Sequence, residues 1–258
     1  MKFKALTAFI LLSLNVHADV AQDCLRFFEE YATDASSGEV SPGCLDWGAQ
    51  IAHDNAWRMS SGSHFKSLSF ENVISYQDGH AKSFFTAGPN TQLAGISAVT
   101  FKESVGRIYA LLGGQGRIVS YDLEIAGNVA PKSVLALAEL EGALDLCASE
   151  SNDEIYILTS SAKEVLVLDG SRNAEGRKEV REMKVIKRIE LPFSDAISLA
   201  LDQVSSALVF LKADGSLVDD KGAMLRAGPS QARSVEWSGR DNGFLARSRG
   251  KIVFKVGR

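Results

Sequence analysis

Short apolar blocks recur along this chain from about residue 64 onward, and this repetition restricts the fold more than any other feature. Each copy contains an apolar run, a second apolar run, a turn and a third run, and two full copies end that third run in Asp122 and Asp169. Three full copies are followed by a fourth apolar run, and a last copy is truncated. The second runs align on positions spaced 47, 53 and 36 residues apart, namely Ile108, Ile155, Leu208 and Phe244.

Each copy therefore predicts a four-stranded antiparallel meander of about 40–50 residues, which is the size of one β-propeller blade. A single sheet of this kind has two apolar faces and cannot bury both alone. Sheets stacked face to face around an axis bury both faces, which explains why the apolar runs are nearly continuous rather than strictly alternating. The sequence predicts a mainly β fold, a propeller of four or five blades over residues 64–258.

Closure of this ring depends on the segment 64–88, which supplies further strands ahead of the first full copy. Its residues Val73-Ile74-Ser75-Tyr76 match the strand Ile118-Val119-Ser120-Tyr121. We expect the N-terminal strands to complete the truncated C-terminal sheet, because this would remove its exposed edge. The alternative is an open arc that closes by dimerisation. We favour a monomer over a dimer.

The copies at 107–122 and 154–169 resemble blades of the YVTN/NHL type of β-propeller. The resemblance rests on Glu154-Ile155-Tyr156-Ile157 and Val165-Leu166-Val167-Leu168-Asp169, and it extends over about 64–258. The third and fourth copies depart from the pattern in being short, and the chain has no Asn-His-Leu triplet or Trp-Asp dipeptide. The resemblance implies the architecture and says little about function.

The first 18 residues have the layout of a cleavable secretory signal peptide. Lys2 and Lys4 form a charged start, an apolar stretch follows, and Val16-His17-Ala18 places short residues at the expected cleavage site. The apolar stretch is about half as long as the ~20 residues that a retained membrane anchor needs. We therefore expect cleavage after Ala18 and a periplasmic or secreted protein that does not span a membrane; a lipoprotein is disfavoured because Asp19, not a cysteine, follows the cut.

Residues 19–63 are expected to form a helical N-terminal segment. Apolar side chains at helical spacing precede a Ser-, Gly- and Pro-rich loop, and Leu45 to Trp57 could line a second helix. In an oxidising compartment Cys24 and Cys44 can form a disulfide that clips the two helices together, worth ~3 kcal/mol. Cys147 lies in an apolar strand pattern and is interpreted as a buried thiol.

The charge is acidic overall but unevenly distributed. The formal net charge is −4, which argues against nucleic acid as a partner. Residues 221–258 nevertheless contain nine basic side chains against Glu236 and Asp241. We interpret this basic module as packing beside acidic neighbours; a basic face for lipid headgroups, lipopolysaccharide or an acidic protein is the alternative.

Three local motifs that could suggest chemistry are better explained by structure. Ser160-Ser161-Ala162-Lys163 spells the S-x-x-K of penicillin-recognising enzymes, but it falls at a strand-connecting turn and lacks the companion motifs. Gly113-Gly114-Gln115-Gly116 joins two strands, whereas phosphate-binding loops lead into a helix. The histidines His53, His64 and His80, with Asp54 and Asp78, lack the spacing of a zinc site.

The candidate site is the propeller axis, where the aligned starts of the innermost strands predict polar side chains at Ser97, Asp145, Ser198 and Glu236. Lactonases of the resembled blade type hold a divalent ion at this place with carboxylates and an amide. Two serines make a poor cage for such an ion, so we expect no metal and no cofactor. Asp145 and Glu236 are the only pair that could serve a glycosidase.

We therefore expect a non-catalytic binding scaffold that contacts a protein or envelope component through its rim loops, the mixed-charge insertion at 171–188 or the basic module. The alternative is a metal- or carboxylate-dependent hydrolase, lactonase- or glycosidase-like, with its site in the central channel.

Overall fold

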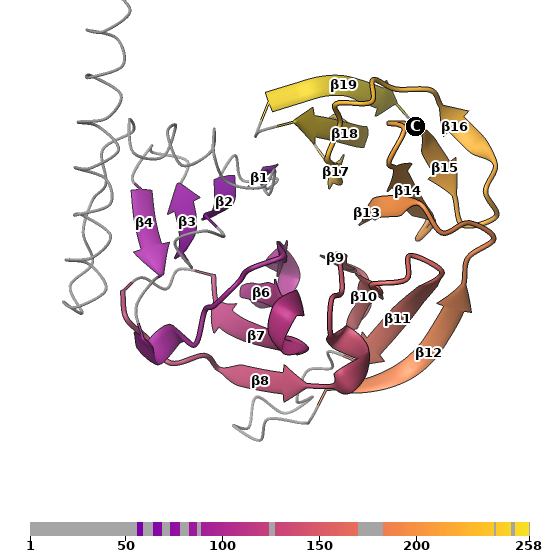
Figure 1. The fold of residues 1–258 in the computed structure, drawn as a ribbon. Helices are drawn as coiled ribbons and strands as arrows, with labels where there is room; N and C mark the ends of the chain where they lie inside the picture. The colour runs from indigo at the N-terminus through magenta and orange to yellow at the C-terminus, as the bar shows by residue number, and fades with distance from the viewer. Residues whose placement is uncertain are drawn as a thin grey trace, which may run out of the picture.

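In the computed structural model the described residues form nineteen strands in five antiparallel sheets arranged around a common centre (Figure 1). The structure describes residues 89–123, 127–169, 183–239, 241–248 and 251–257, together with the strands at 56–58, 64–68, 73–77 and 83–86. Four sheets have four strands each and the last sheet has three. This arrangement is a β-propeller.

The first two sheets each follow chain order from one edge to the other. The strands of the first sheet are β1 (Ala56–Arg58), β2 (His64–Leu68), β3 (Val73–Gln77) and β4 (Ser83–Thr86). The strands of the second sheet are β5 (Ala98–Lys102), β6 (Arg107–Leu112), β7 (Arg117–Asp122) and β8 (Ser133–Ala136). Four short 3-10 turns lie beside or between these strands: η2 (Pro89–Thr91), η3 (Glu103–Val105), η4 (Gly113–Gln115) and η5 (Ala138–Leu140).

The remaining three sheets repeat this meander. The third sheet contains β9 (Asp145–Ala148), β10 (Glu154–Leu158), β11 (Glu164–Asp169) and β12 (Lys184–Glu190). The fourth sheet contains β13 (Ala196–Leu201), β14 (Leu208–Lys212), β15 (Leu217–Asp219) and β16 (Met224–Arg226). The fifth sheet contains β17 (Ser234–Ser238), β18 (Gly243–Ser248) and β19 (Lys251–Gly257).

The predicted propeller and its modules are confirmed, but the predicted closure is wrong in one respect. The N-terminal strands form a four-stranded sheet of their own, β1 to β4, and none of the four pairs with β17, β18 or β19. The strand β3 takes the third position of its sheet, as β7 does in the next, so the matched sequences occupy equivalent places. The first strand that the structure describes begins at Ala56, ahead of the expected start at residue 64, and Trp57 lies in β1 rather than in a helix.

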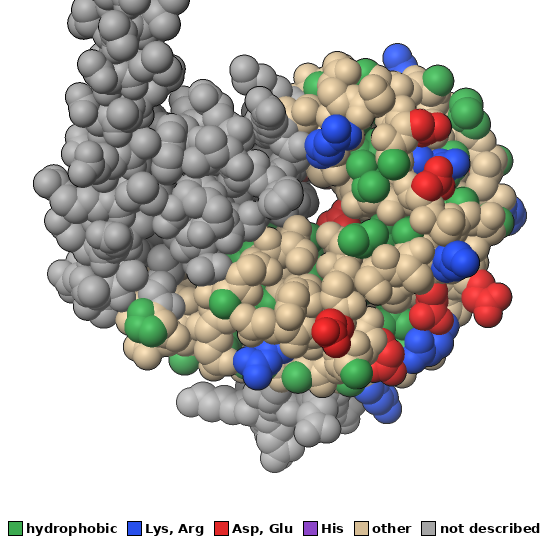
Figure 2. Space-filling view, viewed as in Figure 1, with side chains coloured by type: hydrophobic (Ala, Val, Ile, Leu, Met, Phe, Trp, Pro, Cys, Tyr) green, Lys and Arg blue, Asp and Glu red, His purple; other side chains and the backbone are tan. Residues whose placement is uncertain are grey.

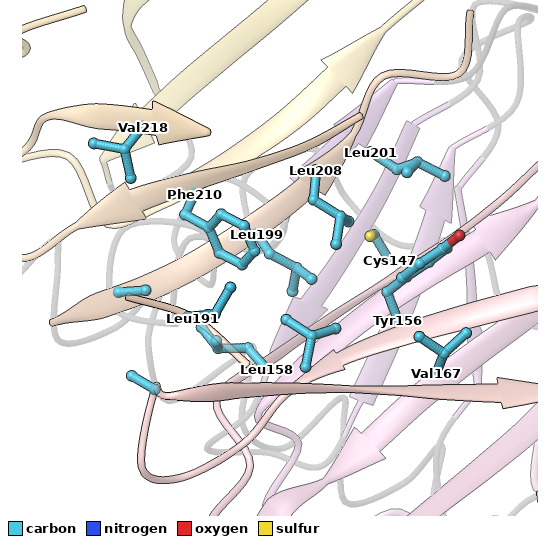
Figure 3. Close-up of a cluster of buried hydrophobic side chains, with 13 residues drawn as sticks. Cys147, Tyr156, Leu158, Val167, Leu191, Leu199, Leu201, Leu208, Phe210 and Val218 are labelled. Carbon is cyan, nitrogen blue, oxygen red and sulfur yellow. The ribbon is translucent and has the colours of Figure 1, made fainter. Parts of the chain in front are cut away.

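The core consists of apolar layers between neighbouring sheets. On β10, Ile155 and Ile157 belong to the cluster shared with the second sheet, whereas Tyr156 and Leu158 belong to the cluster shared with the fourth. Side chains alternate across a strand, so a strand with no polar face has to be covered on both sides. Figure 3 shows the layer between the third and fourth sheets, where Phe210 is fully buried. Burial of one such side chain stabilises the fold by about 1.5–3 kcal/mol.

The turns between second and third strands are built on residues with positive φ. Gly116, Ala162 and Gly215 have φ of 60°, 54° and 90° in three successive sheets. A Cβ at Gly215 would lie 2.2 Å from the carbonyl oxygen of Pro229, so only glycine fits that turn. The turn predictions for Gly113–Gly116 and Ser160–Lys163 are confirmed, and neither segment leads into a helix.

Two predictions fall wholly or partly outside the described residues. These are the signal peptide with the disulfide-clipped hairpin, up to residue 55, and most of the charged insertion at 171–188. The last five residues of that insertion, from Lys184, belong to β12, an outer strand with largely exposed side chains. No helix within the described part of the chain has the length and apolar character needed to cross a membrane.

Candidate functional site

The innermost strands contact one another in chain order, β5 with β9, β9 with β13 and β13 with β17. They lie nearest to the centre of the ring, and Figure 2 shows a hollow in the middle of this face. The pairing with each second strand defines equivalent positions. Ala98 pairs with Leu111, Asp145 with Leu158, Ser198 with Leu211 and Ser234 with Arg247.

Residues at these equivalent positions lie at one level along the channel axis. Of the four predicted axial residues, Asp145 and Ser198 lie at this level, and Ser97 and Glu236 do not. Asp145 and Ser198 are equivalent, whereas Ser97 precedes its level by one residue and Glu236 follows its level by two. The predicted axial position is therefore off by one residue in the first copy and by two in the last. Ser234, not Glu236, is the register equivalent of Asp145.

Asp145 and Ser198 form a hydrogen-bond relay from one sheet to the next. The Ser198 hydroxyl donates to Oδ2 of Asp145, and the same oxygen accepts the Leu199 N–H at 3.0 Å. The Ser198 Oγ in turn accepts the N–H of Val235 at 3.0 Å. Leu199 and Val235 directly follow Ser198 and Ser234, the positions equivalent to Asp145 in their sheets. In both steps a polar side chain therefore accepts a backbone N–H at the same place in the next sheet.

The relay has a structural cause. An innermost strand has a neighbouring strand on one side only, so alternate backbone groups point toward the axis and need other partners. Asp145 and Ser198 supply acceptors for the following sheet. Ala98 cannot do so, and the N–H of Leu146 is instead accepted by Oδ1 of Asp145 at 2.8 Å. The residues at this level therefore satisfy the backbone of the channel wall.

Burial controls the ionisation of Asp145, which is 7 % exposed. Loss of solvent raises the pKa of this carboxyl to about 6, and the hydrogen bonds from Ser198, Leu199 and Leu146 oppose the rise. The adjacent Cys147 thiol also has a raised pKa, because it is buried and because the Asp145 charge disfavours a thiolate. A carboxyl with a pKa in this range can exchange a proton near neutral pH.

Glu236 is held by a buried counter-ion. The Nε of Arg247 donates to Oε1 of Glu236 at 2.7 Å, and Nη2 of the same guanidinium donates to the same oxygen. Both side chains are buried, and they lie on the paired strands β17 and β18. The carboxylate charge of Glu236 is therefore neutralised by Arg247 within the fifth sheet.

Ser97 stabilises the turn that follows β6, where the second sheet lies next to the third. Its Oγ accepts the N–H of Gly113 at 3.2 Å. A Cβ at Gly113 would lie 2.6 Å from this oxygen and 2.5 Å from the carbonyl oxygen of Ala143, which explains the glycine. Ser97 therefore has a packing role beside the channel.

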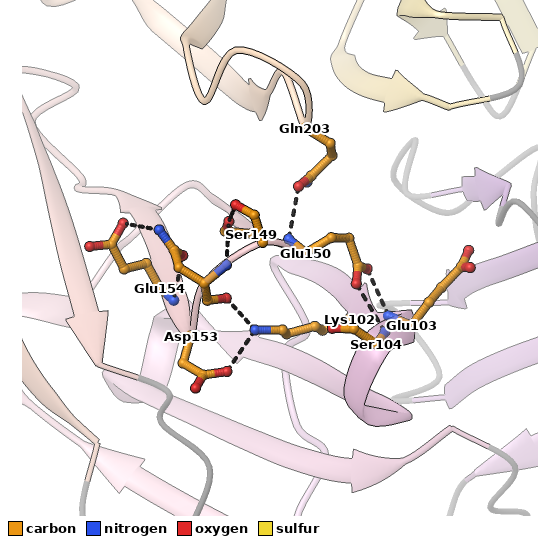
Figure 4. Close-up of polar contacts among 10 residues, drawn as sticks. Lys102, Glu103, Ser104, Ser149, Glu150, Asp153, Glu154 and Gln203 are labelled. Atoms are coloured by element: carbon orange, nitrogen blue, oxygen red, sulfur yellow. Dashed lines mark hydrogen bonds and ion pairs between the residues drawn. The ribbon is translucent and has the colours of Figure 1, made fainter. Parts of the chain in front are cut away.

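A second set of contacts joins three sheets at the turns after the innermost strands (Figure 4). The Glu150 carboxylate accepts the N–H groups of Glu103 at 2.7 Å and Ser104 at 2.9 Å. One sheet further on, Gln203 accepts the N–H of Glu150 at 2.8 Å and donates to the carbonyl oxygen of Ala148 at 2.8 Å. We call Glu150 and Gln203 the inter-sheet clasp, because each reaches back to the backbone of the preceding sheet.

Lys102 strengthens the same region from the second sheet. It is only 4 % exposed, and its ammonium forms an ion pair with Asp153 at 2.8 Å and donates to the carbonyl oxygen of Asn152. Lys102, Glu150 and Gln203 were not predicted from the sequence. Their signal was spacing, since Glu150 and Gln203 each lie five residues after the channel position of their own sheet.

Among the residues that the structure describes, no group of three or more His, Cys, Asp or Glu side chains is placed to hold a metal ion. His64 lies in β2, while His53 and His80 fall outside the described residues. The carboxylate oxygens of Asp145 accept hydrogen bonds from the Ser198 hydroxyl and from two backbone N–H groups, and a cation would have to displace these donors.

No family model matches the chain, and no curated protein sequence matches it. Solved structures do resemble it. Virginiamycin B lyase from Staphylococcus aureus has a TM-score of 0.50 at 11% identity, covering 86% of this chain and 74% of its own. Its catalytically inactive H270A variant with quinupristin gives 0.50 at 10%, covering 86% and 73%.

Hydrazine synthase from Kuenenia stuttgartiensis has a TM-score of 0.52 at 12% identity, and the match covers 76% of this chain and 55% of that one. Identities this low show a shared fold and no more. The similarity to these structures agrees with the sheet arrangement, and both support assignment of the chain to the β-propeller fold.

Proposed function

We propose that the chain is a non-catalytic binding scaffold of the periplasm or cell exterior, which contacts a protein or envelope component through loops at the propeller rim. The observation that favours this proposal is the use made of the channel carboxylates. Asp145 accepts three hydrogen bonds from the channel wall, and Glu236 is paired with Arg247. Carboxylates engaged in this way are committed to the fold rather than available to a substrate.

The proposal includes the finer features expected from the sequence. Export would follow cleavage after Ala18, Cys24 and Cys44 would clip a helical segment over 19–63, and the blades would be of the YVTN/NHL repeat type. The exposed rim supplies contact surface. Val204, in the loop between β13 and β14, is 61 % exposed and is an apolar side chain suited to a protein contact.

The second candidate is a hydrolase with its site in the channel, lactonase- or glycosidase-like. The observation that favours it is the pKa of Asp145 near 6, a value suited to a general acid or base. The structural neighbours include a protein named as a lyase and one named as a synthase, so propellers of this general shape do host chemistry. Against it stands the absence of a second uncompensated carboxyl at the same level among the described residues.

A photo-crosslinking amino acid placed at Val204 in the exported full-length protein tests the scaffold proposal. The matched control places it at Val134, which is 45 % exposed on the outer strand β8. We expect a discrete adduct at Val204 that is weaker or missing at Val134 and that persists in the Asp145→Asn variant. Hydrolysis of lactone or glycoside substrates that is lost in Asp145→Asn, without a rim adduct, would overturn the proposal in favour of the hydrolase.

A further inference from the structure

We propose that the outer edge of β19 binds an extended, acidic segment of another polypeptide, which adds to the fifth sheet as its fourth strand. This inference rests on the proposed binding function and adds a docking mode and a partner class to it. In the part of the chain that the structure describes, the fifth sheet differs from the other four in having three strands.

Each of the first four sheets has a fourth strand outside its third, namely β4, β8, β12 or β16. The fifth sheet has β17, β18 and β19, and within the described residues no strand lies on the outer side of β19. With seven residues, β19 is as long as any strand described in the molecule. A long strand with an open edge presents a row of N–H and C=O groups to which another strand can pair.

The contact at Lys255 shows which backbone groups of β19 face outward. The carbonyl oxygen of Lys255 accepts a hydrogen bond from Nη1 of Arg226 at 2.9 Å, and Arg226 lies on β16 of the neighbouring sheet. This carbonyl therefore points away from β18, and a docking strand would take the place of the Arg226 side chain as its partner. In an antiparallel pair, the backbone groups of successive residues point alternately toward and away from the partner strand. When the register shift near Arg247 is taken into account, the backbone N–H and C=O groups of Ile252 and Gly257 also point away from β18. These three residues are also exposed, Ile252 at 44 %.

The charge around this edge selects an acidic partner. Arg226 and Lys255 are the exposed basic side chains that the described contacts place at its C-terminal end. Asp241 pairs with Lys255 at 2.8 Å, but Lys255 is still 55 % exposed. A second copy of this chain would bring its own basic strand to the edge. Like charges across paired strands are unfavourable, so an acidic strand fits better than self-pairing.

Apolar groups beside the edge define the rest of the partner. Arg226 lies over the ring of Phe254 at 5.8 Å, which places β16 alongside β19. Met224 and Leu225 of β16 are exposed apolar side chains. A strand that alternates acidic with β-branched residues would direct its charges to the basic groups and its apolar side chains to this surface.

Fluorescence anisotropy with the full-length mature chain tests the proposal. The probe is a labelled ten-residue peptide of alternating glutamate and valine or threonine. One control peptide carries lysine for glutamate, and a second is the acidic peptide methylated on alternate backbone nitrogens. We expect the acidic peptide to bind at least tenfold more tightly than either control, and its affinity to fall with added salt.

Pairs of variants distinguish the contribution of side-chain charge to peptide binding from that of backbone hydrogen bonds. Lys255→Glu should weaken binding by about threefold to tenfold, whereas Lys163→Glu, at an exposed turn of the third sheet, should leave it unchanged. Lys255→Pro removes an outward N–H without breaking a bond to β18, so it should abolish binding while Lys255→Ala retains most of it. Unchanged thermal unfolding of the Lys255→Pro variant confirms that the fold is intact.

Equal binding of the three peptides, or no binding of the acidic one, would overturn the proposal. A dimer in sedimentation analysis that Lys255→Pro dissociates would assign the edge to a second copy and would overturn it too. Failure of this inference is distinguishable from failure of the proposed function. A rim adduct at Val204 with no peptide binding at β19 would leave the scaffold proposal intact and reject the edge site alone.

Discussion

The hydroxyl of Ser198 donates a hydrogen bond to Oδ2 of Asp145 across the junction between the third and fourth sheets. Both side chains are buried, and they occupy equivalent positions on neighbouring innermost strands. The contact links the stability of two sheets to the ionisation of one carboxyl. The contribution of these two residues can therefore be measured as the free energy of unfolding at different pH values.

Asp145→Asn should remove a pH dependence of stability. Burial raises the pKa of Asp145 from 3.8 to about 6, so the folded protein retains a proton that the unfolded chain releases between these values. The resulting stabilisation is complete below pH 3.8 and is lost as pH rises through 6, a change of about 3 kcal/mol. Urea unfolding at several pH values measures it. Asp220→Asn, at an exposed position, serves as control. If the free energy of unfolding of Asp145→Asn varied with pH as it does in the wild type, Asp145 would not be the group that titrates.

Ser198→Ala should destabilise the fold by about 1–3 kcal/mol, because it leaves the Val235 N–H without its acceptor and removes a donor from Asp145. It should also shift the pH-dependent loss of stability to higher pH, since the Ser198 hydrogen bond lowers the pKa of Asp145. Denaturation over the same pH range checks both effects. Ser161→Ala, at an exposed turn, is the matched control; equal behaviour of the two variants would contradict the relay.

Glu236→Gln should cost about 3–5 kcal/mol, because the buried Arg247 would lose its counter-ion. The double variant Glu236→Leu with Arg247→Met removes both charges and should be more stable than Glu236→Gln alone. Thermal unfolding of the two variants and the wild type measures the difference. If the double variant were the least stable of the three, the pair would have a role beyond charge compensation.

Glu150→Ala should lower stability by about 1–3 kcal/mol, since the N–H groups of Glu103 and Ser104 both lose their acceptor. Glu190→Ala, an exposed change in β12, should cost less than about 0.5 kcal/mol. Hydrogen exchange at Glu103 and Ser104 gives a local measurement. Protection that survives in Glu150→Ala would show that the clasp is not the source of order in this turn.

Cys147 should resist thiol reagents in the folded protein, because it is buried and its thiol has a raised pKa. In denaturant without reductant, the mature chain should release one reactive thiol, because Cys24 and Cys44 are predicted to be joined. A colorimetric thiol titration before and after unfolding measures this. Three reactive thiols would contradict the disulfide, and a rapid reaction of the native protein would contradict burial of Cys147.

The sequence by itself determined the strands from β5 onward and the meander that each copy forms, although not the sheet to which the N-terminal strands belong. Residues such as Ile155 to Leu158 and Val165 to Leu168 are apolar without interruption, and a strand of this kind is stable only between two other layers. Turn residues between the runs fixed the meander. These are local properties, and the structure retains them.

Only the tertiary structure decided the level at which side chains meet along the axis. A shift of one residue, as at Ser97, moves a side chain to the opposite face of a strand. A shift of two residues, as at Glu236, keeps the face but moves the side chain along the strand, away from the position equivalent to Asp145. The roles of Asp145, Glu150 and Gln203 arise from backbone groups of neighbouring sheets about 50 residues away in the chain. Such partners are set by how the sheets stack, and spacing within one copy does not specify them.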